Sequence, residues 1–393
     1  MTSINKAPFS LAFTAIAVLV GIAPVSLQAQ ATEVRTLSYA KEYSLRSSVL
    51  DEDRTFWVSL PTSYEDPSFG AESYPVIYAL DGSSVFFPLA GLVNFMSGWE
   101  NVNYQIPEAI VIGINTPERL RDLTPNGGDR FFEFLTRELF PLIEAEYRTL
   151  PHRVYVGHSL GGLTSTLTLL EQPGVFDGYL AIDPSLWWDS ARVVLEAPQN
   201  LRAFGTQDVQ RYYVSVIDSA AAGPLASHVN AIRQIGAKLG ANAPDNLAWK
   251  LDVILGTDHS SIPLLSWYNG LLFVFDGYDL RHYGTMENPE LIEPHFDSLA
   301  VKTGLRMDPP QTIFHILSHY LTTPNRYPDA EKAMYVIDMG LKYHPHSPFL
   351  HEKLGAAYEL MEDLPRALEA YETSLRLNPG NEELEAKIVD LRR

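Results

Sequence analysis

The chain has 393 residues, of which 46% are hydrophobic and 20% charged, a composition typical of a globular protein long enough for two domains. Its formal net charge of −19 disfavours nucleic acid and anionic membrane surfaces as partners, because an acidic surface repels phosphate groups. The absence of cysteine excludes disulfides, thiolate metal sites and a cysteine nucleophile.

The first 31 residues have the features of a secretory signal peptide. Lys6 is the only charged residue before Glu33, and an apolar run follows it over residues 9–23. Ala29-Gln30-Ala31 has the small-x-small form of a signal-peptidase site. The apolar run is short for a membrane-spanning helix. We therefore expect cleavage near Ala31 and a secreted or periplasmic mature protein without a membrane anchor.

From residue 33 onward, short apolar runs alternate with segments of helical spacing. The alternating pattern over 33–60 predicts antiparallel edge strands. More continuous apolar runs predict buried strands at 74–80, 110–114, 154–156, 179–182, 211–217 and 247–255. This order predicts βαβ units, a mostly parallel sheet covered by helices, and a functional site where the C-terminal ends of the strands meet.

The pattern changes after residue 275. Residues 281–310 are rich in proline and predict an irregular linker, which would end a main domain of residues 32–280. Over residues 311–393, pairs such as Ala333 and Ala367 stand 34 positions apart, the period of tetratricopeptide repeats. We therefore expect a helical tail of about two repeats that binds a protein partner or mediates self-association.

The segment Gly157-His158-Ser159-Leu160-Gly161 is the main candidate for catalysis. It joins a predicted strand to a predicted helix and matches the nucleophile elbow, in which glycines flank an exposed serine. Ser159 is therefore the predicted nucleophile. The N–H of Leu160 is a predicted oxyanion donor, and Gly82 or Ser83, which follow an earlier strand, would supply a second one.

A serine hydroxyl needs a base to become a good nucleophile. Among the eleven histidines, His259 is the best candidate because it stands in a polar loop directly after the last predicted strand. The chain order serine, acid, histidine then requires a carboxylate between the two. Asp218 fits because it follows a predicted central strand, while Asp183, Asp189 and Asp258 remain alternatives.

Several motifs together resemble the esterase branch of the α/β hydrolases, which includes esterase D-like enzymes and ferric-siderophore esterases. They are YALDG at 78–82, RDLTP at 121–125, YVGHSLGG at 155–162, IDPSLWWD at 182–189 and DHSSIP at 258–263. The resemblance covers roughly residues 34–277 and implies an α/β-hydrolase fold. It also implies ester hydrolysis with Ser159 as nucleophile and His259 as base, without a metal or organic cofactor.

The substrate is predicted less directly. Aromatic side chains that could line an apolar pocket are Trp187 and Trp188, together with Trp99 and Trp267. Positive charge for a polyanionic ferric catecholate would have to come from Arg121, with Arg119 and Arg130. Because the net charge opposes such a substrate, we favour a small carboxylic ester. The alternative from another class is a non-catalytic hydrolase-fold scaffold that recruits partners through its tail.

Overall fold

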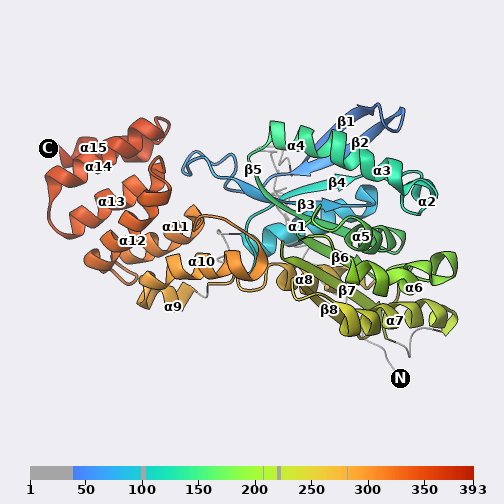
Figure 1. Cartoon of the computed structure of the whole chain (residues 1–393). Coiled ribbons are helices and arrows are strands. Elements are labelled where there is room, and N and C mark those ends of the chain that lie inside the picture. The colour runs from blue at the N-terminus through green and yellow to red at the C-terminus, as the bar shows by residue number, and fades with distance from the viewer. Residues whose placement is uncertain (1–38, 99–102, 207, 219–222, 281) are drawn as a thin grey trace, which may run out of the picture. The chain divides into compact units, whose positions relative to one another are not determined.

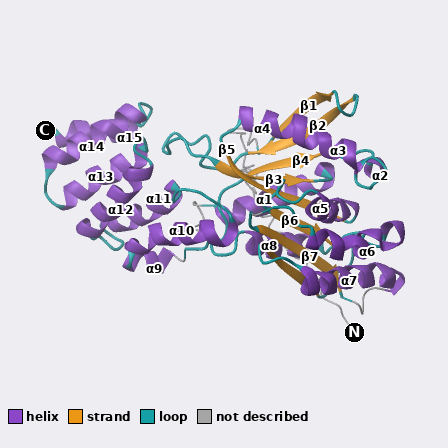
Figure 2. Cartoon of the chain, viewed as in Figure 1, coloured by secondary structure: helices purple, strands orange, loops and turns teal. Residues whose placement is uncertain are grey.

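The computed structural model describes residues 39–98, 103–206, 208–218, 223–280 and 282–393. The predicted signal peptide over residues 1–31 lies outside the described residues. Residues 39–393 form one compact unit that contains a β-sheet flanked by helices and a C-terminal series of helices (Figures 1 and 2).

The described residues contain one sheet of eight strands. The strands are β1 (Lys41–Ser47), β2 (Glu52–Ser59), β3 (Tyr74–Ala79), β4 (Ile110–Ile114), β5 (Thr149–His158), β6 (Gly178–Ile182), β7 (Gln210–Ile217) and β8 (Leu247–Ile254). Their order in the sheet is β1-β2-β4-β3-β5-β6-β7-β8. β1 pairs antiparallel with β2, and β2 with β4, whereas all other neighbours are parallel. The prediction of a mostly parallel sheet with antiparallel edge strands is confirmed.

Burial explains why the central strands read as continuous apolar runs. Every residue of β3, β4, β6 and β7 is buried, because helices cover both faces of a parallel sheet. β1 lies at the edge of the sheet and is mostly exposed, which matches its polar sequence.

Two layers of helices cover the sheet (Figure 1). α1 (Gly82–Ser97) and α8 (Pro263–Val274) contact each other on one face. The other face carries α5 (Leu160–Glu171), α6 (Trp188–Arg202) and α7 (Ala226–Asn242), which contact one another in that order. The remaining elements before residue 280 are α2 (Arg119–Asp122), α3 (Gly128–Phe134), the π-helical turn η1 (Leu135–Leu139), α4 (Phe140–Glu146) and the 3₁₀ turn η3 (Gly223–Leu225). This arrangement is an α/β-hydrolase fold.

The C-terminal part of the chain is helical from residue 282 onward. Its elements are α9 (His282–Glu287), the 3₁₀ turn η4 (Pro289–Leu291), α10 (Ile292–Thr303), α11 (Gln311–Thr322), α12 (Ala330–Tyr343), α13 (Pro348–Leu360), α14 (Leu364–Leu377) and α15 (Glu382–Leu391). The prediction of an irregular linker over 281–310 is therefore wrong. Pro289 and Pro294 stand in first turns, where the missing N–H breaks no helical hydrogen bond.

α11 packs against the loop that precedes β3. The N–H of Gly70 donates to Gln311 Oε1 at 2.8 Å, and the Gln311 amide donates back to the Gly70 carbonyl at 3.0 Å. The rings of Phe69 and His315 stack with centroids 5.0 Å apart. Buried residues of α11, α12 and α13 belong to the same hydrophobic core as the sheet, whereas α14 and α15 share a small separate core.

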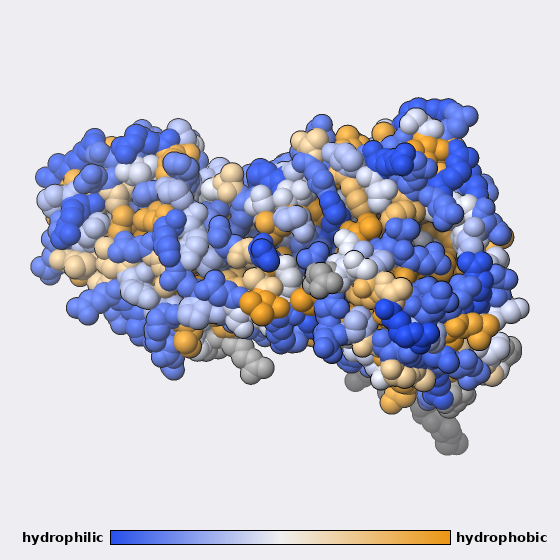
Figure 3. All heavy atoms as spheres, in the orientation of Figure 1, coloured by the Kyte–Doolittle hydropathy of each residue, from blue (hydrophilic) through white to orange (hydrophobic). Residues whose placement is uncertain are grey.

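None of the helices in the described ranges is both long and apolar enough to cross a membrane. The face drawn in Figure 3 is mostly hydrophilic, with small apolar patches among the polar side chains.

Candidate active site

The predicted nucleophile lies in a sharp turn between β5 and α5. Ser159 has φ 59° and ψ −114°, a strained conformation with positive φ that projects its side chain from the end of the strand. A Cβ on Gly157 would lie 2.1 Å from the Gly161 carbonyl oxygen, so only glycine permits the turn at that position. A Cβ on Gly161 would meet its nearest neighbour at 3.4 Å, so the steric requirement lies at Gly157.

The elbow is tied to the loop that follows β6. The N–H of Ser159 donates to the Ile182 carbonyl at 3.0 Å, and the N–H of Ser185 donates to the Ser159 carbonyl at 2.9 Å. Ser159 Oγ lies 3.2 Å from Ser185 Oγ. No hydrogen bond joins Ser159 Oγ to His259 within the described residues. Such bonds are often long in free enzymes and form when substrate binds.

His259 stands in the loop between β8 and α8, at the same edge of the sheet. Its side chain is 34% exposed. The turn that carries it is fixed by Asp258, whose carboxylate accepts the N–H of Ser260 at 3.0 Å and that of Ser261 at 2.9 Å. This exposed turn holds the imidazole next to the elbow while leaving one side open to substrate.

His158 also positions the loop of His259, a contact that the sequence did not reveal. Its Nε2 lies 2.8 Å from the His259 carbonyl oxygen, and the two ring centroids are 4.6 Å apart. Burial, together with the neighbouring His259, lowers the pKa of His158 to about 4. The ring is therefore neutral at physiological pH, and its Nε2–H can donate to the carbonyl.

The carboxylate at His259 belongs to Asp183. Asp183 follows β6, is fully buried, and its Oδ2 lies 2.6 Å from His259 Nδ1. The N–H of Ile217, at the end of β7, donates to Oδ1 at 3.3 Å. Burial acts to raise the pKa of Asp183, but the hydrogen bonds from His228 and His259 outweigh it and hold that pKa below its usual range. An ionised carboxylate only accepts hydrogen bonds, so His259 carries its proton on Nδ1.

The choice of Asp218 as the acid is therefore corrected. Asp218 follows β7, as predicted, but no hydrogen bond joins it to His259 in the described part of the chain. The Asp183 carboxylate reaches across the end of β7 to the N–H of Ile217 and thus occupies the position beside His259. Asp189 is exposed and lies 3.9 Å from Arg192, and no hydrogen bond joins it to His259 among the described residues.

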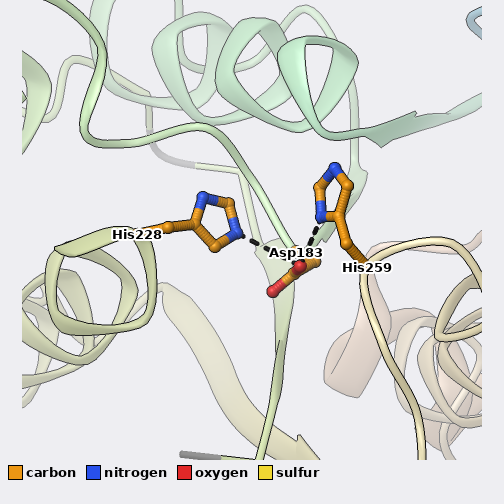
Figure 4. A group of neighbouring side chains, drawn as sticks. All are labelled: Asp183, His228 and His259. Carbon is orange, nitrogen blue, oxygen red and sulfur yellow. Dashed lines mark hydrogen bonds and ion pairs between the residues drawn. The ribbon is translucent and has the colours of Figure 1, made fainter. Parts of the chain in front are cut away.

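A second histidine, His228 in the first turn of α7, contacts the same carboxylate (Figure 4). Its Nε2 lies 3.1 Å from Asp183 Oδ2, and its side chain is almost fully buried. The His228 and His259 rings are perpendicular, with centroids 5.4 Å apart. Sequence reasoning passed over His228. The available signal was its place just after β7, because every segment that follows a parallel strand begins at this edge.

Two helices begin beside the elbow and present N–H groups to it. Leu160 is the first residue of α5, and Gly82 and Ser83 are the first two of α1. First-turn N–H groups have no acceptor within their own helix and can stabilise negative charge. A Cβ on Gly161 would lie 3.6 Å from Asp81 Oδ2, so the start of α1 is close to the start of α5.

The tryptophans predicted for a substrate pocket differ in exposure. Trp187, five residues after Ile182, is 46% exposed, and the ring of Trp188 lies 5.9 Å from it. Both remain candidates for substrate contact at this edge. Trp267 is buried in α8 and belongs to the core. Trp99 lies outside the described residues.

The arginines predicted to attract an anionic substrate are already engaged. Arg121 forms two hydrogen bonds with Glu52, at 2.6 and 3.0 Å, and a third with Asp122 at 2.7 Å. Arg119 binds the Asp81 carboxylate through Nε at 2.7 Å and Nη2 at 2.9 Å. Arg130 donates to a backbone carbonyl. These contacts offset the positive charge that Arg119 and Arg121 could offer to a polyanionic substrate, and the place of Arg121 in a substrate pocket stays a prediction.

Comparison with known proteins agrees with this geometry. A model of the family described as "Putative esterase" matches residues 47–222. This part of the chain is similar to that esterase family. The matched segment contains Ser159 and Asp183, whereas His228 and His259 lie beyond its end.

Individual proteins similar to this segment have related names. The chain is 30% identical over 162 residues to "Siderophore triacetylfusarinine C esterase" of Aspergillus fumigatus, a match that covers 36% of this chain and 54% of the relative. It is 33% identical over 167 residues to "Ferri-bacillibactin esterase BesA" of Bacillus subtilis, covering 35% and 56%. The chain thus spans little more than half the length of these relatives.

Among solved structures, the fold of this chain resembles that of an "IroE-like serine hydrolase" from Shewanella oneidensis. The TM-score is 0.69 at 25% sequence identity, and the match covers 77% of this chain and 99% of the other. The similarity therefore extends over more of the chain than the family match.

Proposed function

We propose that this protein is a serine carboxylic ester hydrolase that works through an acyl-enzyme on Ser159. The observation that carries the proposal is the convergence of three strand ends, which bring an elbow serine, His259 and the buried Asp183 to one edge of the sheet. The esterase family match over residues 47–222 supports it. The non-catalytic scaffold is disfavoured because a binding module has no need for a histidine held in the tautomer of a base.

The residues divide the reaction between them. Ser159 Oγ attacks the ester carbonyl while His259 Nε2 accepts its proton, and the Asp183 carboxylate holds the proton on Nδ1. The negative charge on the carbonyl oxygen is stabilised by the N–H of Leu160 and by that of Gly82 or Ser83. His259 then protonates the leaving alcohol, and water hydrolyses the acyl-enzyme by the reverse roles.

A fluorophosphonate probe and the variant Ser159→Ala test this mechanism. The probe labels only an activated serine, so the wild-type protein should be labelled and the variant should not. Loss of a nucleophile that acts as part of a triad costs on the order of a million-fold in kcat. Ester turnover by a folded Ser159→Ala variant at close to the wild-type rate would contradict the serine mechanism.

For the substrate we propose an uncharged carboxylic ester with an apolar or aromatic group near Trp187. The support is local charge, because Arg119 and Arg121 are both paired with carboxylates. Ferric-siderophore esters are the second candidate, and the names of the similar proteins favour them. Hydrolysis of a panel of nitrophenyl esters, a ferric catecholate and a ferric hydroxamate ester would decide between them. Faster cleavage of the siderophores in kcat/KM would overturn our preference.

We further propose that residues 1–31 are a cleaved signal peptide and that the protein acts in the periplasm or outside the cell. The support is the apolar run and the Ala29-Gln30-Ala31 sequence. N-terminal sequencing of the protein recovered from each cell fraction tests this proposal. A cytoplasmic protein that begins at Met1 would contradict it.

We propose that the C-terminal helices form a tetratricopeptide-like module. Its support is the 34-residue spacing and the packing of Gly355 against Tyr371, where a Cβ would come within 2.5 Å of the ring. Such modules bind peptides or other subunits along their helices. Light scattering of the full chain tests self-association through this module.

A further inference from the structure

The carboxylate of Asp183 faces two histidines, although a serine triad needs only one. His259 Nδ1 and His228 Nε2 lie 2.6 and 3.1 Å from the same oxygen, Oδ2. His259 comes from the loop after β8 and His228 from α7, so the aspartate lies between two separate elements (Figure 4). The function proposed above gives His259 a role and leaves His228 without one.

We propose that His228 is a positioning residue that holds the Asp183 carboxylate in the orientation required by His259. The inference rests on the proposed function and deepens it. An ionised carboxylate only accepts hydrogen bonds, so His228 presents a protonated Nε2 to Oδ2. With the Ile217 N–H on Oδ1, three donors from the end of β7, α7 and the His259 loop restrain the carboxylate.

Packing alone does not explain a histidine at this position. His228 is 3% exposed and lies on the face of α7 that also buries Val229 and Ile232. A polar ring nitrogen in such surroundings costs free energy unless it has a partner, and an aliphatic side chain would fill the space without that cost. In the described residues, His228 Nε2 lies 3.1 Å from Asp183 Oδ2, and the contact is bent rather than well aligned.

The same three side chains are of the types that hold zinc, but their spacing indicates hydrogen bonds. Two ligands of one tetrahedral zinc ion, each about 2.0 Å from the metal, lie about 3.3 Å apart. Asp183 Oδ2 and His259 Nδ1 are 2.6 Å apart, which is the distance of a charge-assisted hydrogen bond. We therefore interpret Asp183, His228 and His259 as a hydrogen-bonded cluster that orients the Asp183 carboxylate, and not as a metal site.

Three variants of His228 separate positioning from packing. Glutamine can place an amide N–H where Nε2 stands, asparagine is polar but too short to do so, and leucine is apolar. We expect His228→Asn and His228→Leu to lower kcat about tenfold with little change in KM, the low end for a hydrogen bond to a charged group because the contact is bent. His228→Gln should recover most of that loss.

The matched control is His152, an equally buried histidine. It lies near the N-terminal end of β5, away from the elbow that follows the C-terminal end. It is 3% exposed and lies 3.7 Å from Asp177, so it resembles His228 in burial and in having an acidic neighbour. His152→Leu and His152→Asn should leave kcat unchanged even where they lower the melting temperature. A fall in kcat for these variants that equals the fall for His228 would show that general destabilisation is the cause.

Two measurements report the activity of each variant: the rate of fluorophosphonate labelling, and kcat for a nitrophenyl ester. Circular dichroism confirms that each variant is folded, and a parallel measurement in EDTA tests for a metal requirement. Equal rates for the His228→Gln and His228→Asn variants would overturn the positioning role, as would loss of wild-type activity in EDTA with recovery in zinc. If His228→Leu does not fold, the comparison of glutamine with asparagine decides. Wild-type protein that is not labelled would instead refute the proposed function itself.

Discussion

Replacement of Asp183 by asparagine should preserve the shape of the site and abolish most of its activity. The N–H of Ile217 donates to Oδ1, so the amide oxygen of the new side chain takes that place and its NH₂ group takes the place of Oδ2. His259 then faces a donor at 2.6 Å and must present the unprotonated Nδ1. Its proton moves to Nε2, where it prevents acceptance of the proton of Ser159.

The expected loss is about four orders of magnitude in kcat, as for the same change in serine proteases, and corresponds to about 5.5 kcal/mol in the activation free energy. Steady-state hydrolysis of a nitrophenyl ester measures it, with melting curves to verify the fold. Asp218→Asn is the matched control, because Asp218 also follows a central strand but makes no hydrogen bond to His259 in the described residues. A loss below tenfold for Asp183→Asn, or an equal loss for Asp218→Asn, would refute the assignment.

Three further changes test the framework of the site. Gly157→Ala should prevent folding or greatly reduce soluble yield, because its Cβ would lie 2.1 Å from a backbone oxygen; normal yield and activity would contradict this. Asp122→Ala should lower the free energy of unfolding in urea by about 1.5–3 kcal/mol, because buried Arg54 loses its partner at 2.6 Å while Glu52 remains 2.5 Å from the same nitrogen; a loss under about 0.5 kcal/mol would contradict the buried pair. Burial and the nearby Glu108 raise the pKa of Glu72 to about 8. The folded state therefore binds a proton that the unfolded state has lost, so stability should fall as pH rises from 5 to 8. Glu72→Gln should flatten this fall in melting temperature, and parallel curves for the two proteins would count against it.

The features that the sequence predicted are those set by short-range patterns. Continuous apolar runs mark strands buried on both faces, so the central strands could be located before the structure was known. The elbow could be located because a strained turn needs glycine at Gly157 and a helix directly afterward. His259 could be selected because a polar loop after the last strand begins at the edge of the sheet where Ser159 lies.

The acid could not be selected in the same way, because several carboxylates follow strands. Asp183 and Asp218 both stand directly after buried strands, so the local sequence does not distinguish which of them is the acid of the triad. The choice depends on the path of the His259 loop, which returns across the end of β7 to meet Asp183 beyond it. His228 was missed for a related reason, since a histidine in the first turn of a helix carries no motif.

The predicted domain boundary near residue 310 differs from the structure, because amino-acid composition does not show which part of the chain a segment packs against. The proline-rich stretch reads as a linker, yet the next helix begins with Gln311, which exchanges two hydrogen bonds with the backbone of Gly70. Glu72 beside this contact has a raised pKa because the contact excludes water. α11 to α13 thus share the hydrophobic core of the sheet, whereas α14 and α15 have a core of their own.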